Sequence, residues 1–143
     1  MQVCQSHNGA TEIIKRIGPT EPYRMLGAYI SAAGNFGLQL KVLTKKTRDW
    51  AYKIRHSALN KSDRLLAYDA HLLPQVFYPI SCMYAGETEL QQALCAGLET
   101  ALNSLSVNRK YPRDIAYAST MYFGLELIDY AVSQGLAQME LYI

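Results

Sequence analysis

Apolar and polar positions alternate most regularly over residues 40–58. Apolar side chains recur there at steps of three and four residues, which places them on one face of an α-helix. This apolar face comprises Leu40, Leu43, Thr47, Trp50, Ile54 and Ala58. The opposite face carries a narrow line of side chains that we call the basic stripe, namely Lys41, Lys45, Arg48, Tyr52 and Arg55. The pattern predicts a long helix with one buried face and one basic face.

Two short apolar runs, residues 11–17 and 23–31, precede this helix. Residues 18–22, Gly-Pro-Thr-Glu-Pro, separate the two runs, and glycine and proline mark turns. We therefore expect the runs to form the two strands of a β-hairpin. The side chains expected to face inward from this hairpin are Ile14, Met25, Leu26 and Ile30.

A second helix is expected over residues 61–78. Asn60, followed three residues later by Asp63, is typical of a helix N-terminus, because an asparagine side chain can accept a backbone N–H there. Pro74 is expected to kink or break this helix, since proline lacks an N–H and its ring clashes with the preceding turn. Pro79 is expected to mark its end.

Two more helices are expected in the C-terminal half. Thr88 and Gln91 have the spacing of a capping box that opens a third helix, and residues 128–143 predict a final helix that Gly135 weakens. Residues 106–120 are irregular, and residues 121–127 fit either a short strand or a tight loop. The apolar face of the third helix comprises Leu90, Leu94, Leu98, Ala101, Leu102 and Leu105.

These elements predict an α+β fold that is mostly α, with a short hairpin followed by a bundle of about four helices. The chain has 143 residues, of which 50% are hydrophobic and 18% charged, which is enough apolar surface for the core of one domain or of a fragment of a larger protein. The three cysteines show no C-x-x-C spacing, which favours a reducing compartment and argues against a disulfide scaffold or a metal site.

The composition predicts no signal peptide, because the first eleven residues are polar. No apolar run approaches the roughly 18 residues that span a bilayer, so we expect an intracellular protein without a membrane partner. The net charge is only +2, but it is unevenly distributed. Residues 41–64 carry eight basic and two acidic side chains, whereas residues 87–143 carry three basic and seven acidic ones. The first of these stretches is expected to attract a polyanion.

The sequence lacks the motifs of the common enzyme classes. It contains neither a phosphate-binding glycine loop nor a nucleophile elbow. A polymerase needs paired carboxylates that hold magnesium ions, and the chain has no Asp-Asp pair. Glu87 and Glu89 precede a helix, where acidic residues favour the helix dipole. We therefore expect no catalytic centre, metal site or cofactor in this chain.

Two basic clusters are candidates for binding nucleic acid. Cations spaced about one helical turn apart can meet successive phosphates, so the basic stripe is one candidate, with Tyr52 as a possible stacking partner and Trp50 in the core. The other is residues 108–113, where a loop could contact a backbone phosphate through Arg109, Lys110 and Arg113. For both clusters, a charged surface that only contacts solvent remains an open alternative.

Several short segments resemble the reverse transcriptases of non-LTR retrotransposons in the region after the catalytic palm. Residues 23–27, Tyr-Arg-Met-Leu-Gly, resemble the primer grip, and residues 108–113, Asn-Arg-Lys-Tyr-Pro-Arg, resemble the N-R-x-x-P-R loop of the family. Residues 123–127, Phe-Gly-Leu-Glu-Leu, are similar to its G-G-L-G-L segment. Tyr68, Pro74 and the pair Tyr78-Pro79 lie between these segments, so the family's order is kept over residues 20–143.

The resemblance implies that residues 1–35 are a primer-grip-like hairpin and that residues 36–143 are a thumb-like helical domain. Arg24, Leu26 and Gly27 would lie near the primer strand. The basic stripe would follow the backbone of an RNA–DNA or DNA duplex. The partners would be this duplex and the rest of the reverse transcriptase, an RNA-directed DNA polymerase whose magnesium ions bind in the palm.

The chain departs from the family in two respects. Phe123 and Glu126 replace glycines, so the backbone is expected to bend differently there, and the catalytic Y/F-x-D-D segment is absent. Two other functions remain open. The chain could be a helical protein-interaction module whose tyrosines and acidic C-terminal part face a partner, or a decayed retroelement fragment without activity.

Overall fold

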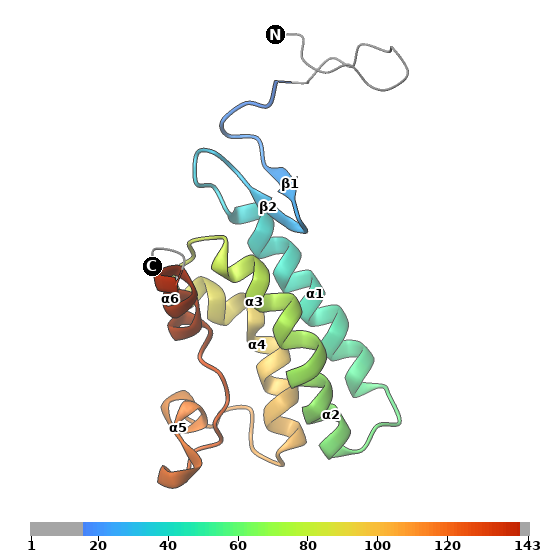
Figure 1. Cartoon of the computed structure of the whole chain (residues 1–143). Helices are drawn as coiled ribbons and strands as arrows, with labels where there is room; N and C mark the ends of the chain where they lie inside the picture. Colours follow the sequence, from blue (N-terminus) through green and yellow to red (C-terminus); the bar gives the residue numbers. More distant parts are fainter. Residues whose placement is uncertain (1–15, 141–143) are drawn as a thin grey trace.

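A small β-hairpin leads into a bundle of helices in the computed structural model, which describes residues 16–140 (Figure 1). The fold is α+β and mostly α, as the sequence predicts. The hairpin lies at the N-terminal end of α1, and α4 packs along α1. The elements are β1 (Tyr23–Met25), β2 (Ala28–Ile30), α1 (Gly37–Arg55), α2 (Lys61–Ala67), the π-helical turn η1 (Tyr68–Leu72), α3 (Leu73–Ser81), α4 (Glu87–Ser104), α5 (Arg113–Tyr117), the 3₁₀ turn η2 (Thr120–Tyr122) and α6 (Tyr130–Glu140).

The hairpin differs from the one expected. Both of its strands lie within residues 23–31. Between them, Leu26 and Gly27 form the turn with φ values of 47° and 94°, and type I′ hairpin turns require positive φ at both central residues. Residues 16–17 are not in a strand. The expected pairing with residues 11–17 is therefore wrong at these two positions. Residues 11–15, including Ile14, lie outside the described residues.

The side chains expected to face inward from the hairpin are mostly exposed. Met25 and Leu26 are 55% and 81% exposed, whereas Ile30 is half-buried. Ala28 is the buried apolar residue of the two strands. The small size of this hairpin explains the difference, because strands of three residues can cover very little of the core.

The long basic helix is confirmed as α1. Leu43, Thr47 and Trp50 are buried, as the periodicity predicts. The helix begins three residues earlier than expected and ends at Arg55, so Ala58 lies beyond it and is exposed.

The second helix continues past Pro74 by changing its hydrogen bonding. The side chain of Asn60 accepts a 2.8 Å bond from the N–H of Asp63, which confirms the expected cap. Before Pro74 the chain forms the π-helical turn η1, in which the N–H of Leu73 bonds to the carbonyl of Tyr68, five residues earlier. This wider turn accommodates the proline that an α-helical turn would reject. Pro79 lies inside α3 and does not end it.

The N-cap of the third helix, α4, lies two residues before the expected one. It is Gly86, and the carboxylate of Glu89 accepts the N–H of Gly86 at 3.0 Å. The capping box expected at Thr88 and Gln91 is therefore wrong, because Thr88 already lies in the first turn of the helix. The expected apolar face is confirmed, since the leucines and the alanine from Leu90 to Leu102 are buried and only Leu105 is half-buried.

The C-terminal part contains a short helix that the sequence pattern did not indicate. Pro112 precedes α5, and residues 121–127 form a turn and a loop rather than a strand. The side chain of Asp129 accepts the N–H of Ala131 at 2.8 Å at the start of α6. Further along α6, the buried side chain of Gln134 donates to the carbonyl of Met83 at 2.7 Å, which ties α6 to the end of α3.

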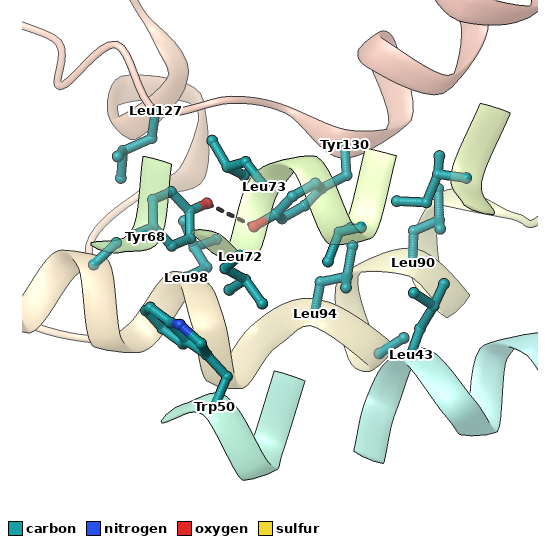
Figure 2. Close-up of a cluster of buried hydrophobic side chains, with 14 of the residues drawn as sticks. Leu43, Trp50, Tyr68, Leu72, Leu73, Leu90, Leu94, Leu98, Leu127 and Tyr130 are labelled. Carbon is teal, nitrogen blue, oxygen red and sulfur yellow. Dashed lines mark hydrogen bonds between the residues drawn. The ribbon is translucent and has the colours of Figure 1, made fainter. Parts of the chain in front are cut away.

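Two tyrosines from distant parts of the chain meet in the core, as Figure 2 shows. The hydroxyls of Tyr68 and Tyr130 are 2.6 Å apart, and both side chains are buried. Burial raises the pKa of Tyr68 to about 12 and also raises the pKa of Tyr130 well above its ordinary value. The ring of Trp50 lies 6.2 Å from that of Tyr68, between centroids. This contact therefore joins α1, η1 and α6.

The helices α1 and α4 cross closely at Gly97. A Cβ atom at this position would lie 2.6 Å from Cδ2 of Leu72 and 3.0 Å from Cγ2 of Thr47. Gly135 in α6 is also helical, but a Cβ there would meet no atom within 4 Å. Both glycines are therefore helical, but a side chain would meet close neighbours at Gly97 and open space at Gly135.

We expect Gly97→Ala to lower the free energy of unfolding and Gly135→Ala to raise it. In a helix alanine is favoured over glycine by about 1 kcal/mol, but overpacking costs typically 1–3 kcal/mol. The expected net change is a loss of about 1 kcal/mol at Gly97 and a gain of about 0.5–1 kcal/mol at Gly135. Urea unfolding of the two variants measures both values, and an equal gain in stability at both positions would contradict the close crossing.

Candidate nucleic-acid interface

The basic stripe lies on the outer face of α1. Lys41, Lys45 and Arg48 are all exposed, because the face of the helix that carries Leu43, Thr47 and Trp50 is the one buried in the bundle. Between residues 16 and 140, one ion pair forms, and it involves none of these three cations. Their charges therefore face solvent without a described carboxylate within ion-pair distance.

The three cations line one wall of a groove between α1 and α4. The groove has a volume of about 550 Å³, and Gln92 belongs to its other wall. Two carboxylates also line it, those of Asp49 and Glu89. The Glu89 carboxylate already accepts the N–H of Gly86 at the start of α4. The groove thus presents three cations against two carboxylates, of which one is engaged in capping a helix.

Arg55 differs from the other cations of the stripe. Its Nε donates to Oγ1 of Thr100 at 3.2 Å, and its Nη2 lies 3.5 Å from Oε2 of Glu99. The side chain is 44% exposed. Arg55 therefore joins the end of α1 to α4 instead of standing free beside Lys45 and Arg48.

Tyr52 is exposed on the same face as the cations. Its exposed fraction is 65%, and its ring lies against that of His56 with 4.2 Å between centroids. Nδ1 of His56 is 2.8 Å from the carbonyl oxygen of Tyr52, which holds the two rings together. Trp50 lies in the core instead, as the sequence predicts, with 7% exposure.

The second basic cluster is divided by the structure. Arg109 and Lys110 are exposed, and the N–H of Lys110 donates to the side chain of Asn108 at 2.9 Å in the turn before α5. Arg113 is half-buried, and its Nη2 donates to the carbonyl of Arg109 at 3.3 Å. The three cations of this cluster therefore do not form one surface.

The hairpin carries its three candidate residues in strand β1 and in the turn that follows it. Arg24, Leu26 and Gly27 are exposed, and a Cβ atom at Gly27 would meet nothing within 4 Å. The positive φ of the turn, rather than a close contact inside the chain, explains the glycine. Gln39 holds the hairpin on α1, because its buried Oε1 accepts the N–H of Tyr29 at 2.7 Å. Sequence reasoning missed Gln39, since a lone glutamine gives no signal of burial.

The loop that resembles a glycine-rich segment keeps a glycine-like backbone. Phe123 and Glu126, which stand where the family has glycine, have φ values of 60° and 51°, in the left-handed region that favours glycine. A Cβ at Gly124 would collide with the carbonyl of Ala118. Both residues thus adopt a conformation that glycine reaches more easily than other residues, and the expected difference in bend from the family stays a prediction.

Hydrogen bonds hold Glu126 in this conformation. Its Oε1 accepts the Oγ of Ser119 at 3.1 Å, the N–H of Thr120 at 3.0 Å and the hydroxyl of Thr120 at 2.8 Å. These bonds lower the pKa of the Glu126 carboxyl below its ordinary value of 4.5, and the bond from the backbone N–H of Thr120 has the largest effect.

No family model matches this chain, and no curated protein or solved structure matches it either. Among residues 16–140, no cluster of His, Cys, Asp or Glu side chains could hold a metal ion. None of the described helices combines the length and apolarity needed to cross a bilayer.

We expect Glu126→Gln to lower the melting temperature at pH 7. The folded pKa of Glu126 is lowered, so its stabilising contribution is fully present above the ordinary value of 4.5 and is lost as the pH falls through the folded pKa. The difference between the wild type and the variant should therefore shrink in acid. Thermal melting at pH 7 and in acid measures it, and equal melting temperatures at pH 7 would contradict the role of these bonds.

Proposed function

We propose that this chain binds nucleic acid as a thumb-like unit that grips a primer–template duplex, as in the reverse transcriptases of non-LTR retrotransposons. One observation carries the proposal: Lys41, Lys45 and Arg48 stand exposed along one stiff helix, and none of them forms an ion pair with a described carboxylate. The rise of an α-helix separates neighbouring cations of this set by about 5 Å along the axis. Such a row can meet successive phosphates of one strand and release their counterions.

Two further features support the thumb-like interpretation. The hairpin that carries Arg24, Leu26 and Gly27 is fixed to the start of the same helix through Gln39, so a primer-grip segment and the cations would contact neighbouring parts of one duplex. The left-handed backbone at Phe123 and Glu126 fits a segment in which the family has glycines.

Within the proposed function, the chain binds and orients the duplex and performs no chemistry. The cations Lys41, Lys45 and Arg48 hold the backbone, and Tyr52 offers an exposed ring for stacking. The carboxylates that bind magnesium and extend the primer would belong to the palm of the polymerase. Arg55 contributes by joining α1 to α4, because its charge is paired with Glu99.

We expect binding of an RNA–DNA duplex to weaken steeply as salt rises. Three phosphate contacts give a slope of log K against log salt of about −2.7, which is roughly a 40-fold loss between 50 and 200 mM salt. The double variant Lys45→Glu/Arg48→Glu should weaken binding more than about tenfold at low salt, because it replaces attraction by repulsion. Fluorescence anisotropy with a labelled duplex measures both effects.

A matched control lies on the same helix. Lys46 and Lys53 are exposed on the flank of α1 away from the groove, so Lys46→Glu/Lys53→Glu makes the same change in net charge. This control should retain most of the affinity. Equal losses in the two double variants, or an affinity that does not respond to salt, would show that the basic stripe is not the binding surface.

A specific surface favours the protein-interaction module as a second candidate. Val132, Leu136 and Met139 are 52–59% exposed and share one side of α6, and apolar side chains gathered on a surface mark docking sites. Under this function the same binding assay would show no response to reversing Lys45 and Arg48, and the chain would form a defined oligomer. A decayed fragment would instead fail to melt cooperatively.

A further inference from the structure

The segment between α5 and α6 exposes three consecutive large apolar side chains, which we call the apolar triplet. Met121, Tyr122 and Phe123 are 83%, 77% and 89% exposed. Single exposed apolar side chains are common on protein surfaces, but several gathered in one place mark a site of contact. The apolar triplet is therefore a candidate for an interaction surface.

The backbone holds the apolar triplet in this exposed position. The N–H of Tyr122 and the N–H of Gly124 both donate to the carbonyl of Ser119, at 2.9 and 3.0 Å. Phe123 has a φ of 60°, in the left-handed region that residues other than glycine rarely adopt. Gly124 lies against the carbonyl of Ala118. Rare backbone conformations held in this way are found at surfaces that bind a ligand, and a preorganised surface loses less entropy on binding.

Negative charge accompanies the apolar triplet. From residue 114 to residue 143 the sequence has four acidic residues and neither lysine nor arginine. The acidic residue closest in sequence is Glu126, whose Oε1 accepts three hydrogen bonds. Its Oε2 accepts none from residues 16–140 and can meet a partner. A carboxylate at this place disfavours contact with phosphates. It favours a protein surface that combines an apolar cleft with cations.

The groove between α1 and α4 has this combination. Leu40 and Ala93 line it together with Lys41, Lys45 and Arg48. The three cations outnumber the two carboxylates of the groove, and none of the three forms an ion pair with a described residue. Its volume of about 550 Å³ is in the range of pockets that enclose a drug-sized ligand. Such a groove has room for large side chains such as that of Phe123.

The apolar triplet and the groove lie in different parts of the molecule. In Figure 1 the segment with the apolar triplet lies beside α5, at the end of the bundle away from the hairpin. The groove is lined by residues 40–49 of α1 and 89–93 of α4, nearer the hairpin. The apolar triplet can therefore reach the groove only on another molecule.

We propose that the apolar triplet of one molecule binds in the groove of a second copy of this chain. In this contact Phe123 packs on the apolar part of the groove, and the carboxylate of Glu126 pairs with Lys45 or Arg48. The contact is heterologous, because it joins two different surfaces, so it repeats from one molecule to the next. The inference goes beyond the proposed function, since it gives the basic stripe a protein partner that competes with nucleic acid.

Sedimentation velocity of the full chain at rising protein concentration measures this contact. We expect the wild type to self-associate at low salt and to associate less as salt rises, because salt screens exposed charges. Phe123→Asp should weaken the association about tenfold or more, since it replaces the central apolar side chain by a charge. The variant should keep its fold, because Phe123 is exposed and aspartate tolerates the left-handed region.

A mixing experiment tests whether two different surfaces meet. Lys45→Glu/Arg48→Glu alters the groove and should also prevent self-association. A mixture of this double variant with Phe123→Asp should form one-to-one dimers, because the first supplies an intact apolar triplet and the second an intact groove. The control is Leu136→Asp, which adds a negative charge to the exposed apolar side of α6. It should associate like the wild type.

Three results would each overturn the inference: a wild type that stays monomeric at every concentration, a mixture of the two variants that stays monomeric, or an association that Leu136→Asp removes and Phe123→Asp does not. Salt-sensitive binding of an RNA–DNA duplex would in each case still support the proposed function. The two proposals can therefore fail separately.

Discussion

The close crossing of α1 and α4 at Gly97 determines which surfaces this chain can present. A Cβ atom at Gly97 would lie 2.6 Å from Cδ2 of Leu72 and 3.0 Å from Cγ2 of Thr47, so the glycine lets the two helices approach closely along one face of each. Because an α-helix repeats every 3.6 residues, burial of Thr47 and Trp50 directs Lys41, Lys45 and Arg48 outward. The ion pair of Arg55 with Glu99 holds the far end of the same contact. The orientation of the basic stripe is thus a consequence of packing.

Buried polar contacts position the C-terminal part. The hydroxyls of Tyr68 and Tyr130 meet inside the core, and Gln134 satisfies the carbonyl of Met83 at the end of α3. Such contacts are specific in geometry, since a misplaced partner would leave a buried polar group unsatisfied. They place α6 beside α3 and α4. The two candidate surfaces of the molecule therefore depend on different parts of its core.

The sequence predicts an element well where apolar side chains recur at one helical period over many residues. The apolar faces of α1 and α4 could be predicted because each repeats over several turns. The hairpin cannot be placed correctly from the sequence, because its strands have three residues each and its turn, Leu26-Gly27, lacks the usual Asn-Gly or Asp-Gly signal. The start of α4 was misplaced because Gly86 with Glu89 has the same spacing as Thr88 with Gln91.

The candidate site, too, could be predicted from the sequence only in part. The direction of Lys41, Lys45 and Arg48 follows from helical geometry alone. The pairing of Arg55 with a residue 44 positions away, and the partial burial of Arg113, depend on tertiary contacts that no local pattern encodes. For the same reason, the sequence suggested a loop of three equivalent cations where the structure separates Arg113 from Arg109 and Lys110.

We propose that the outer face of α1 contacts the nucleic acid, and NMR can map this contact residue by residue. Two-dimensional NMR spectra of the labelled chain can be recorded while an RNA–DNA duplex is added at low salt. If the proposal is correct, the largest shift changes will occur at Lys41, Lys45, Arg48 and Tyr52. Changes confined to α6 and residues 121–123, or no changes at all, would contradict it.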